Sequence, residues 1–221
     1  MKFGQAFSYV FKDPDWFKKI IIPALCGLIP VVGQFIVIGY TFKVAKKLIA
    51  EGTDTPLPVL DFGADLGKGF MVSLITLLFV LPVMILGSIA GGIGGALAGV
   101  YEEAWVIILS ILAACVGILA GLLALLITFI LPPAIANYAA KDVFKAAFNF
   151  KEIFGMIKKS FKSWLLVFVG SLLAGLIAPL GSIACGIGVI LTAIFAALVN
   201  YHLIGQAYNV SNTPIQGEIV L

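Results

Sequence analysis

Apolar residues run in long uninterrupted stretches along this chain, and the charged residues gather between them. Three stretches contain no Asp, Glu or Lys: residues 69–101, 104–140 and 163–217. Each is longer than the roughly 20 residues that an α-helix needs to cross a bilayer. The pattern therefore predicts membrane-crossing helices, and it excludes a soluble protein.

The first apolar run, residues 20–42, fits either one membrane span or a tight hairpin that turns at residues 29–33, Ile-Pro-Val-Val-Gly. One span would place Lys18 and Lys19 across the membrane from Lys43. This arrangement opposes the general preference of lysine for the cytoplasmic side. A hairpin puts every lysine on one side, so we expect the hairpin.

The other long segments are expected to close as hairpins too, with turns at residues 101–103 and 178–181. The first arm of the first hairpin, residues 14–29, is only about 24 Å long at 1.5 Å per residue. That hairpin is expected to tilt, to thin the bilayer locally or to be re-entrant. The predicted fold is an all-α, polytopic membrane helix bundle of about six membrane helices in three hairpins. Both chain ends are expected on the cytoplasmic side of the cell membrane.

The whole chain, 1–221, is expected to form a single membrane domain. Amphipathic or interfacial stretches precede the hairpins, with apolar side chains on one helical face and lysines opposite. These stretches are expected to lie on the cytoplasmic side. The expected segments are an amphipathic start (1–19), a proline-broken hairpin (20–50), an interfacial loop (51–68), a second hairpin (69–140), an amphipathic helix (141–162), a third hairpin (163–210) and a tail (211–221).

Glycines recur at every fourth position in one part of the second hairpin. The ridge consists of Gly87, Gly91, Gly95 and Gly99. Small residues at this spacing let two helices approach closely inside a membrane. The ridge is therefore expected to contact another helix.

Composition supports a membrane protein and narrows its partners. Hydrophobic residues make up 62% of the chain and charged residues 11%. The net charge of +3 results from fourteen basic and eleven acidic residues, and none of the basic residues is arginine. Arginine is the usual bidentate partner of phosphate in nucleic-acid sites, so no nucleic acid is expected. The expected partners are the lipid bilayer, anionic lipid headgroups that attract the lysines, and another membrane protein or a second copy of the chain.

His202 is the one titratable side chain inside the apolar runs. Ionisable groups are costly within a membrane and usually mark a function or a pairing. His202 follows two polar residues and precedes a third by one helical turn. The candidate polar cluster is Asn200, Tyr201, His202 and Gln206. Either it is a functional site, or the histidine forms hydrogen bonds between helices near the interface.

No catalytic, cofactor or metal site is expected. The three cysteines, Cys26, Cys115 and Cys185, lie in apolar runs without metal-binding spacing, and the Glu102-Glu103 pair has no further ligand near it. The sequence also lacks a Ser/His/Asp set, an HExxH motif and a Walker sequence. A membrane-embedded lipid enzyme would need a histidine and carboxylate cluster, which is missing. The chain is not expected to be an enzyme.

Several short elements resemble a known family. They are residues 6–16 with the Asp-Pro-Asp-Trp sequence, Pro56-Leu57-Pro58 followed by 61–63, and residues 201–208. They are similar to a family of prokaryotic multi-pass membrane proteins catalogued only as a domain of unknown function. The resemblance implies a multi-pass architecture, and it implies no activity, cofactor or catalytic residue.

The leading hypothesis is a non-enzymatic membrane protein that acts as an accessory, scaffold or membrane-organising component. It would act through helix packing and through its lysine-bearing interfacial segments. The alternative is a passive channel or permease for a small neutral or lipid-like solute. A channel or permease would need a continuous polar path through the helices, which an accessory protein would not need. The candidates for such a path are Ser73, Thr76, Ser88, Ser110, Thr128, Ser171 and Thr192.

Overall fold

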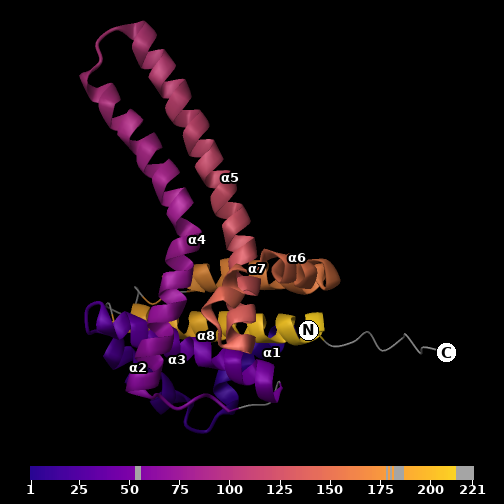
Figure 1. The fold of residues 1–221 in the computed structure, drawn as a ribbon. Helices are drawn as coiled ribbons and strands as arrows, with labels where there is room; N and C mark the ends of the chain where they lie inside the picture. The colour runs from indigo at the N-terminus through magenta and orange to yellow at the C-terminus, as the bar shows by residue number, and fades with distance from the viewer. Residues whose placement is uncertain (53–55, 178, 180, 182–186, 213–221) are drawn as a thin grey trace, which may run out of the picture. The chain divides into compact units, whose positions relative to one another are not determined.

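The computed structural model describes residues 1–52, 56–177, 179, 181 and 187–212. These residues form helices joined by short connections and contain no β-strand, which confirms the predicted all-α fold (Figure 1). The chain divides into two compact units. Unit 1 comprises Met1–Ile75 and Pro132–Leu221, and unit 2 comprises Thr76–Leu131.

Unit 2 is a hairpin made from the distal parts of two long helices. Helix α4 (Phe62–Ala96) continues into the 3-10 turn η2 (Leu97–Gly99), and α5 (Glu103–Lys141) returns. Within unit 2 the two arms, 76–99 and 103–131, are about 36 and 44 Å long. Each arm can therefore cross the roughly 30 Å hydrocarbon core of a bilayer. Most leucine and isoleucine side chains of this hairpin are exposed, as they are in helices that face lipid.

Unit 1 begins with a short arm and a helical hairpin. Helix α1 (Phe3–Ser8) and the 3-10 turn η1 (Val10–Lys12) precede α2 (Trp16–Gly27) and α3 (Val32–Glu51). The turn falls at residues 28–31, which confirms the predicted hairpin. A methyl group at Gly33 would stand 1.9 Å from the carbonyl oxygen of Cys26, so only glycine fits this tight connection.

The remaining helices of unit 1 pack around α8. The 3-10 turn η3 (Phe144–Phe148) leads to α6 (Phe150–Lys159) and α7 (Phe161–Ile177), and α8 spans Ile187–Asn212. Helix α8 contacts α1, α2, α3, α6 and α7. Its Ile194 and Leu198 lie in a buried cluster with Tyr40 and Leu57. Residues far apart in the sequence therefore share one core.

Helices α3 and α4 cross at two glycines. A methyl group at Gly39 would stand 1.8 Å from the carbonyl oxygen of Asp65, and one at Gly69 would stand 1.7 Å from that of Phe35. Both approaches are impossible for any residue with a Cβ atom, so these two glycines set the distance between the helices.

The predicted glycine ridge lies farther along α4 and in η2, and its surroundings are open. A methyl group at any of its four positions would meet no atom within 4 Å. The expected helix contact is therefore absent within the described chain, and a contact with another chain stays a prediction. The ridge consists of Gly87, Gly91, Gly95 and Gly99.

Three helical segments are long and apolar enough to cross a membrane: 62–99, 103–141 and 188–212. The pair α6 and α7, bent by 99° at their junction, becomes a fourth if it counts as one span. The sequence predicts about six such helices. The difference has a physical reason. Helices α2 and α7 have 12 and 17 residues, fewer than a straight crossing needs, and α3, with 20 residues, carries Lys43, Lys46 and Lys47 in its second half.

Candidate functional site

The predicted polar cluster on α8 separates into different contacts. The Nδ1 atom of His202 lies 3.0 Å from the amide nitrogen of Gln206. The Gln206 side chain accepts a 2.7 Å hydrogen bond from the backbone N–H of Lys2 and donates a 3.2 Å bond to the Lys2 carbonyl. The His202 ring also packs on Tyr9, with centroids 4.3 Å apart. These two cluster members hold the start of the chain against α8.

The other two members of the cluster face different helices. The side-chain oxygen of Asn200 accepts a 2.9 Å hydrogen bond from the Ser171 hydroxyl of α7. The ring of Tyr201 packs edge-on against Phe42 of α3. Consecutive residues of an α-helix point about 100° apart, so residues 200–202 cannot converge on one ligand. Among the described residues, the hydrogen bond of His202 lies within α8 rather than between helices, and its buried Nε2 atom has no hydrogen-bond partner. A functional role for His202 stays a prediction.

Ion pairs between lysines and carboxylates are a feature that sequence reasoning missed. Five of them occur among the described residues. The two pairs that involve Asp142 join residues 74 and 96 positions apart. The pairs are Lys19–Asp13, Lys43–Asp65, Lys46–Asp142, Lys68–Asp142 and Lys141–Glu152. The five lysines involved already contact carboxylates, and Lys46 and Lys68 share the carboxylate of Asp142. They are therefore poorer candidates for binding lipid headgroups than lysines that form no ion pair.

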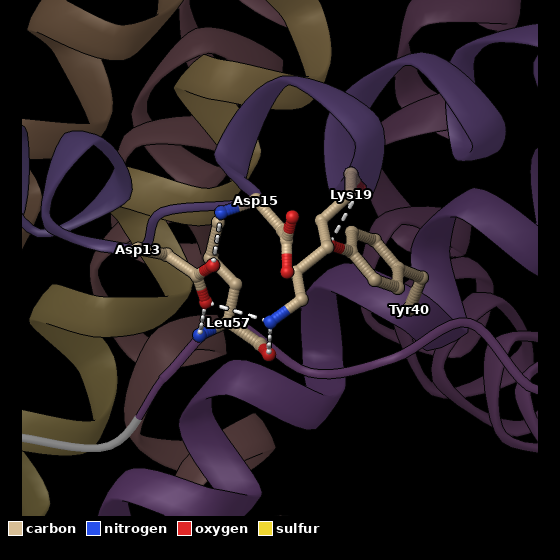
Figure 2. A network of polar contacts seen from close by, with 5 residues as sticks. All are labelled: Asp13, Asp15, Lys19, Tyr40 and Leu57. Atoms are coloured by element: carbon tan, nitrogen blue, oxygen red, sulfur yellow. Dashed lines mark hydrogen bonds and ion pairs between the residues drawn. The ribbon is translucent and has the colours of Figure 1, made fainter.

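Asp13 organises a buried network at the start of α2 (Figure 2). One carboxylate oxygen accepts hydrogen bonds from Lys19 Nζ at 2.7 Å and from the Leu57 N–H at 2.9 Å. The other accepts the Asp15 N–H at 2.9 Å. Lys19 Nζ also donates to the Leu57 carbonyl at 3.2 Å. We call Asp13, Lys19 and Leu57 the Asp13 clasp, because together they tie the Pro-Leu-Pro loop to α2.

Burial and hydrogen bonding act on Asp13 in opposite directions. Only 3% of its side chain is exposed, and this burial would by itself raise its pKa. The hydrogen bonds from Lys19 and from the two backbone amides outweigh burial and hold the pKa of Asp13 below its ordinary value. The Asp13 carboxylate is therefore charged at neutral pH, and the clasp is intact there.

Asp65 connects α4 to α3. Its carboxylate accepts the Asp61 N–H at 2.8 Å while the Asp61 side chain accepts the Ala64 N–H at 3.0 Å. This reciprocal arrangement caps the start of α4. Its second oxygen forms an ion pair with Lys43 Nζ at 2.6 Å, and the Asp65 side chain is only 1% exposed.

The remaining ion pairs lie at the surface. Asp142, which adopts a left-handed φ of 55°, pairs with Lys46 at 2.9 Å and also with Lys68. Hydrogen bonds from Lys68 and Lys46 hold the pKa of Asp142 below its usual value. Glu152 accepts hydrogen bonds from Lys141 and, at 2.8 Å, from Asn137.

A polar pocket of about 320 Å³ adjoins Glu152, where α5, α6 and α8 end. Its wall includes the last residue of each helix, Lys141, Lys159 and Asn212. Helix C-termini carry partial negative charge, which lysines compensate. The lysines of this pocket therefore have a structural explanation. Among the described residues, no group of three or more His, Cys, Asp or Glu side chains could hold a metal ion.

Residues 22–187 match the family model described as "Protein of unknown function (DUF4013)". The chain belongs to the DUF4013 family. The match confirms the family that the sequence elements resemble. Comparisons with the curated proteins and with the solved structures found no match.

The part of the chain that matches DUF4013 includes α6, which is amphipathic as predicted. Its inner face buries Ile153, Met156 and Ile157, and Phe150 and Phe154 are exposed on its outer side. Five lysines on and beside this helix are exposed and form no ion pair among the described residues. We call them the α6 lysine surface: Lys145, Lys151, Lys158, Lys159 and Lys162.

Proposed function

We propose that this protein is a non-enzymatic, multi-pass protein of the cell membrane, with an accessory or membrane-organising role. In this proposal the α6 lysine surface holds anionic lipid headgroups on the cytoplasmic side. One observation carries the proposal. Helix α6 turns by 99° from α7 and presents lysines and phenylalanines outward while its inner face packs in the core.

Because of the bend, α6 and α7 would be oriented differently relative to a membrane. Helix α7 carries no charged residue after Lys162, and its exposed side chains include Leu165, Leu172 and Leu176. If α7 enters the bilayer, α6 lies close to the membrane plane, as interfacial amphipathic helices do. Its exposed phenylalanines then insert between lipids, and each nearby lysine gains about 1 kcal/mol from anionic headgroups.

Membrane topology follows from the same distribution of charge. The proposed topology places all fourteen lysines and both described chain ends on the cytoplasmic side, with Glu102 and Glu103 outside. The unit 2 hairpin then crosses the bilayer twice. Its open glycine ridge is available for helix packing with another membrane protein or with a second copy of this chain.

No observation favours the channel alternative. Several hydroxyls of its candidate polar path donate to backbone carbonyls one turn earlier in their own helices. Such bonds satisfy the hydroxyls locally, so these residues need no water-filled path. They are Ser88, Thr128 and Thr192, and the Ser171 hydroxyl is satisfied by Asn200 or by its own helix.

The test measures lipid selectivity in phosphatidylcholine vesicles that contain the full chain. Electron spin resonance gives the fraction of spin-labelled phosphatidylglycerol that the protein immobilises, relative to spin-labelled phosphatidylcholine. Replacing Lys151, Lys158 and Lys162 with Gln should lower this preference by about fivefold for each lysine removed, which corresponds to about 1 kcal/mol each. The matched control replaces Lys46, Lys68 and Lys141, which are already paired, and should keep most of the preference. Equal effects of the two triple variants would contradict the proposal.

The accessory role is tested separately by gentle detergent extraction from native membranes and mass spectrometry. A stoichiometric protein partner supports it, and a chain that migrates as a lone monomer contradicts it.

A further inference from the structure

A crevice opens between the first half of α2 and the loop that follows α3. Its volume is about 290 Å³. We call it the α2 crevice. The residues that line it are Asp15, Lys18, Lys19, Ile22, Pro23, Val59 and Leu60.

The crevice is apolar inside and charged at one end. Ile22 and Pro23 form its α2 wall, and Val59 and Leu60 form the opposite wall. The second wall is fixed in place, because the neighbouring Leu57 is buried in the core and held by the Asp13 clasp. An apolar pocket with a few polar groups at one end suits an amphiphile.

The charged end offers one cation and one anion. Lys19 is committed to Asp13 and to the Leu57 carbonyl. The Asp15 carboxylate and the Lys18 ammonium are exposed and form no ion pair among the described residues. The two residues are three positions apart at the start of α2, so their side chains are neighbours. Together they complement a zwitterionic group better than an anionic one.

If the apolar end of α2 enters a bilayer, the charged end of the crevice lies at the level of the lipid headgroups. The helix begins with Trp16, Lys18 and Lys19, and its far end carries exposed Leu25 and Leu28. Aromatic and lysine side chains at one end and apolar ones at the other are typical of a helix that enters a bilayer. A lipid in the crevice would thus have its headgroup at Lys18 and its acyl chain along Ile22.

We propose that the α2 crevice binds one phospholipid whose zwitterionic headgroup carries a primary ammonium, as in phosphatidylethanolamine. The phosphate lies at Lys18 and the ammonium at Asp15, with an acyl chain between Ile22 and Val59. A primary ammonium donates hydrogen bonds to a carboxylate, whereas a quaternary ammonium cannot and favours aromatic rings. None of the seven residues that line the crevice is aromatic. A purely anionic headgroup would face the uncompensated charge of Asp15.

This inference does not rest on the proposed function, because the crevice contains no residue of the α6 lysine surface. The experiment releases the full chain from nanodiscs with equal amounts of phosphatidylethanolamine, phosphatidylcholine and phosphatidylglycerol. Native mass spectrometry then identifies the lipids that stay bound. The wild type should retain one phosphatidylethanolamine. Asp15→Asn and Lys18→Gln should each reduce its retention about tenfold, the loss of one charge-assisted hydrogen bond.

Two further variants separate this site from general electrostatics. Ile22→Trp fills the crevice without changing charge and should abolish retention. Asp15→Lys places two uncommitted lysines at the rim and should shift the preference to phosphatidylglycerol. The control Lys12→Gln removes an exposed lysine outside the crevice and should change nothing. Thermal unfolding confirms that each variant is folded.

Retention of the three lipids in equal amounts by the wild type would overturn the proposal, as would an unchanged preference in Asp15→Lys. Soluble phosphoethanolamine serves as a competitor with the same headgroup chemistry. It should not displace the lipid at equal concentration, because it lacks the acyl chain that the apolar walls hold. Displacement would overturn the assignment to a lipid.

Discussion

The hydroxyl of Tyr40 donates a 2.7 Å hydrogen bond to the backbone carbonyl of Lys19 (Figure 2). This carbonyl would normally accept the N–H of the residue four positions later, which is Pro23. Proline has no N–H, so α2 leaves the carbonyl without its helical partner. Tyr40, on the neighbouring α3, supplies the missing donor. A proline inside α2 is therefore tolerated because the second arm of the hairpin compensates for it.

This compensation predicts a coupled effect of two substitutions. Tyr40→Phe leaves the partly buried carbonyl unsatisfied and should lower the free energy of unfolding by about 1–3 kcal/mol. In a Pro23→Ala background the helix provides its own N–H, so the same substitution should cost clearly less. A double-mutant cycle from thermal unfolding in detergent measures the coupling. Strictly additive effects would show that Tyr40 does not replace the missing donor.

The Asp13 clasp predicts a large loss of stability on neutralisation. Asp13→Asn removes the charge that pairs with Lys19 Nζ, and the Lys19 side chain is only 20% exposed. Breaking a buried ion pair typically costs about 3–5 kcal/mol, and we expect the lower end of that range because Lys19 keeps some contact with water. Asp15→Asn, a change of the same kind two residues away, should cost less than about 0.5 kcal/mol. Similar midpoints of thermal unfolding for the two variants would count against the clasp.

The lowered pKa of Asp13 predicts a specific dependence of stability on acid. The pKa is lower in the folded chain than in the unfolded chain, where it is about 3.9. The carboxylate therefore contributes its full stabilisation above that pH, and the contribution is lost as pH falls through the folded-state pKa. Between pH 5 and pH 2, roughly, the wild type should lose more stability than Asp13→Asn does. Parallel pH profiles of the two proteins would contradict this assignment.

The two kinds of glycine in α3 and α4 predict opposite outcomes. Gly39→Ala and Gly69→Ala place a methyl group within 2 Å of a backbone carbonyl oxygen, and they should cost several kcal/mol or prevent folding. Gly87→Ala and Gly91→Ala meet open space, and they should be neutral or stabilising by up to about 1 kcal/mol. Yield of folded protein after size-exclusion chromatography and midpoints of unfolding compare the two groups. Equal tolerance at Gly39 and Gly87 would refute the close crossing.

The carboxylate of Asp65 is buried and that of Asp142 is exposed, so the two should contribute differently to stability. Asp65→Asn disturbs a buried ion pair and the cap of α4 together, so it should cost about 3 kcal/mol or more. Asp142→Asn loses contacts of a side chain that is 43% exposed, and surface pairs contribute at most about 1 kcal/mol each. Added salt should weaken the effect at Asp142 more than the effect at Asp65. Chemical unfolding at low and high ionic strength tests both statements.

Local features of the fold were predictable from the sequence, whereas the pairing between distant segments was not. The α2–α3 turn follows from Pro30 and Gly33, and amphipathic α6 follows from its periodicity. Glycine spacing within one helix indicates a face without bulky side chains, but it does not show which face of the helix another helix will cover. The ridge was therefore expected to pack, and Gly39 and Gly69 were missed.

The polar cluster on α8 shows a second limit. Asn200, Tyr201 and His202 are adjacent in the sequence, yet a helix directs them to different neighbours. The lysine–carboxylate pairs were missed for a related reason. A lysine cluster between apolar runs indicates membrane orientation, but no local pattern shows that Asp13 will reach Leu57, 44 residues away.

The hydrogen bonds between Lys2 and Gln206 join residues that are 204 positions apart. A ribosome adds about 5–20 residues each second, so α1 leaves it at least about ten seconds before its binding surface on α8 has been made. Helices α2 and α3 also cannot complete their packing before α8 has been made, because both contact α8. The newly made α1 must therefore remain without its contacts to α8, with Phe3 and Phe7 uncovered, until the later helices have been made. Unit 1 is completed after translation of α8 rather than helix by helix.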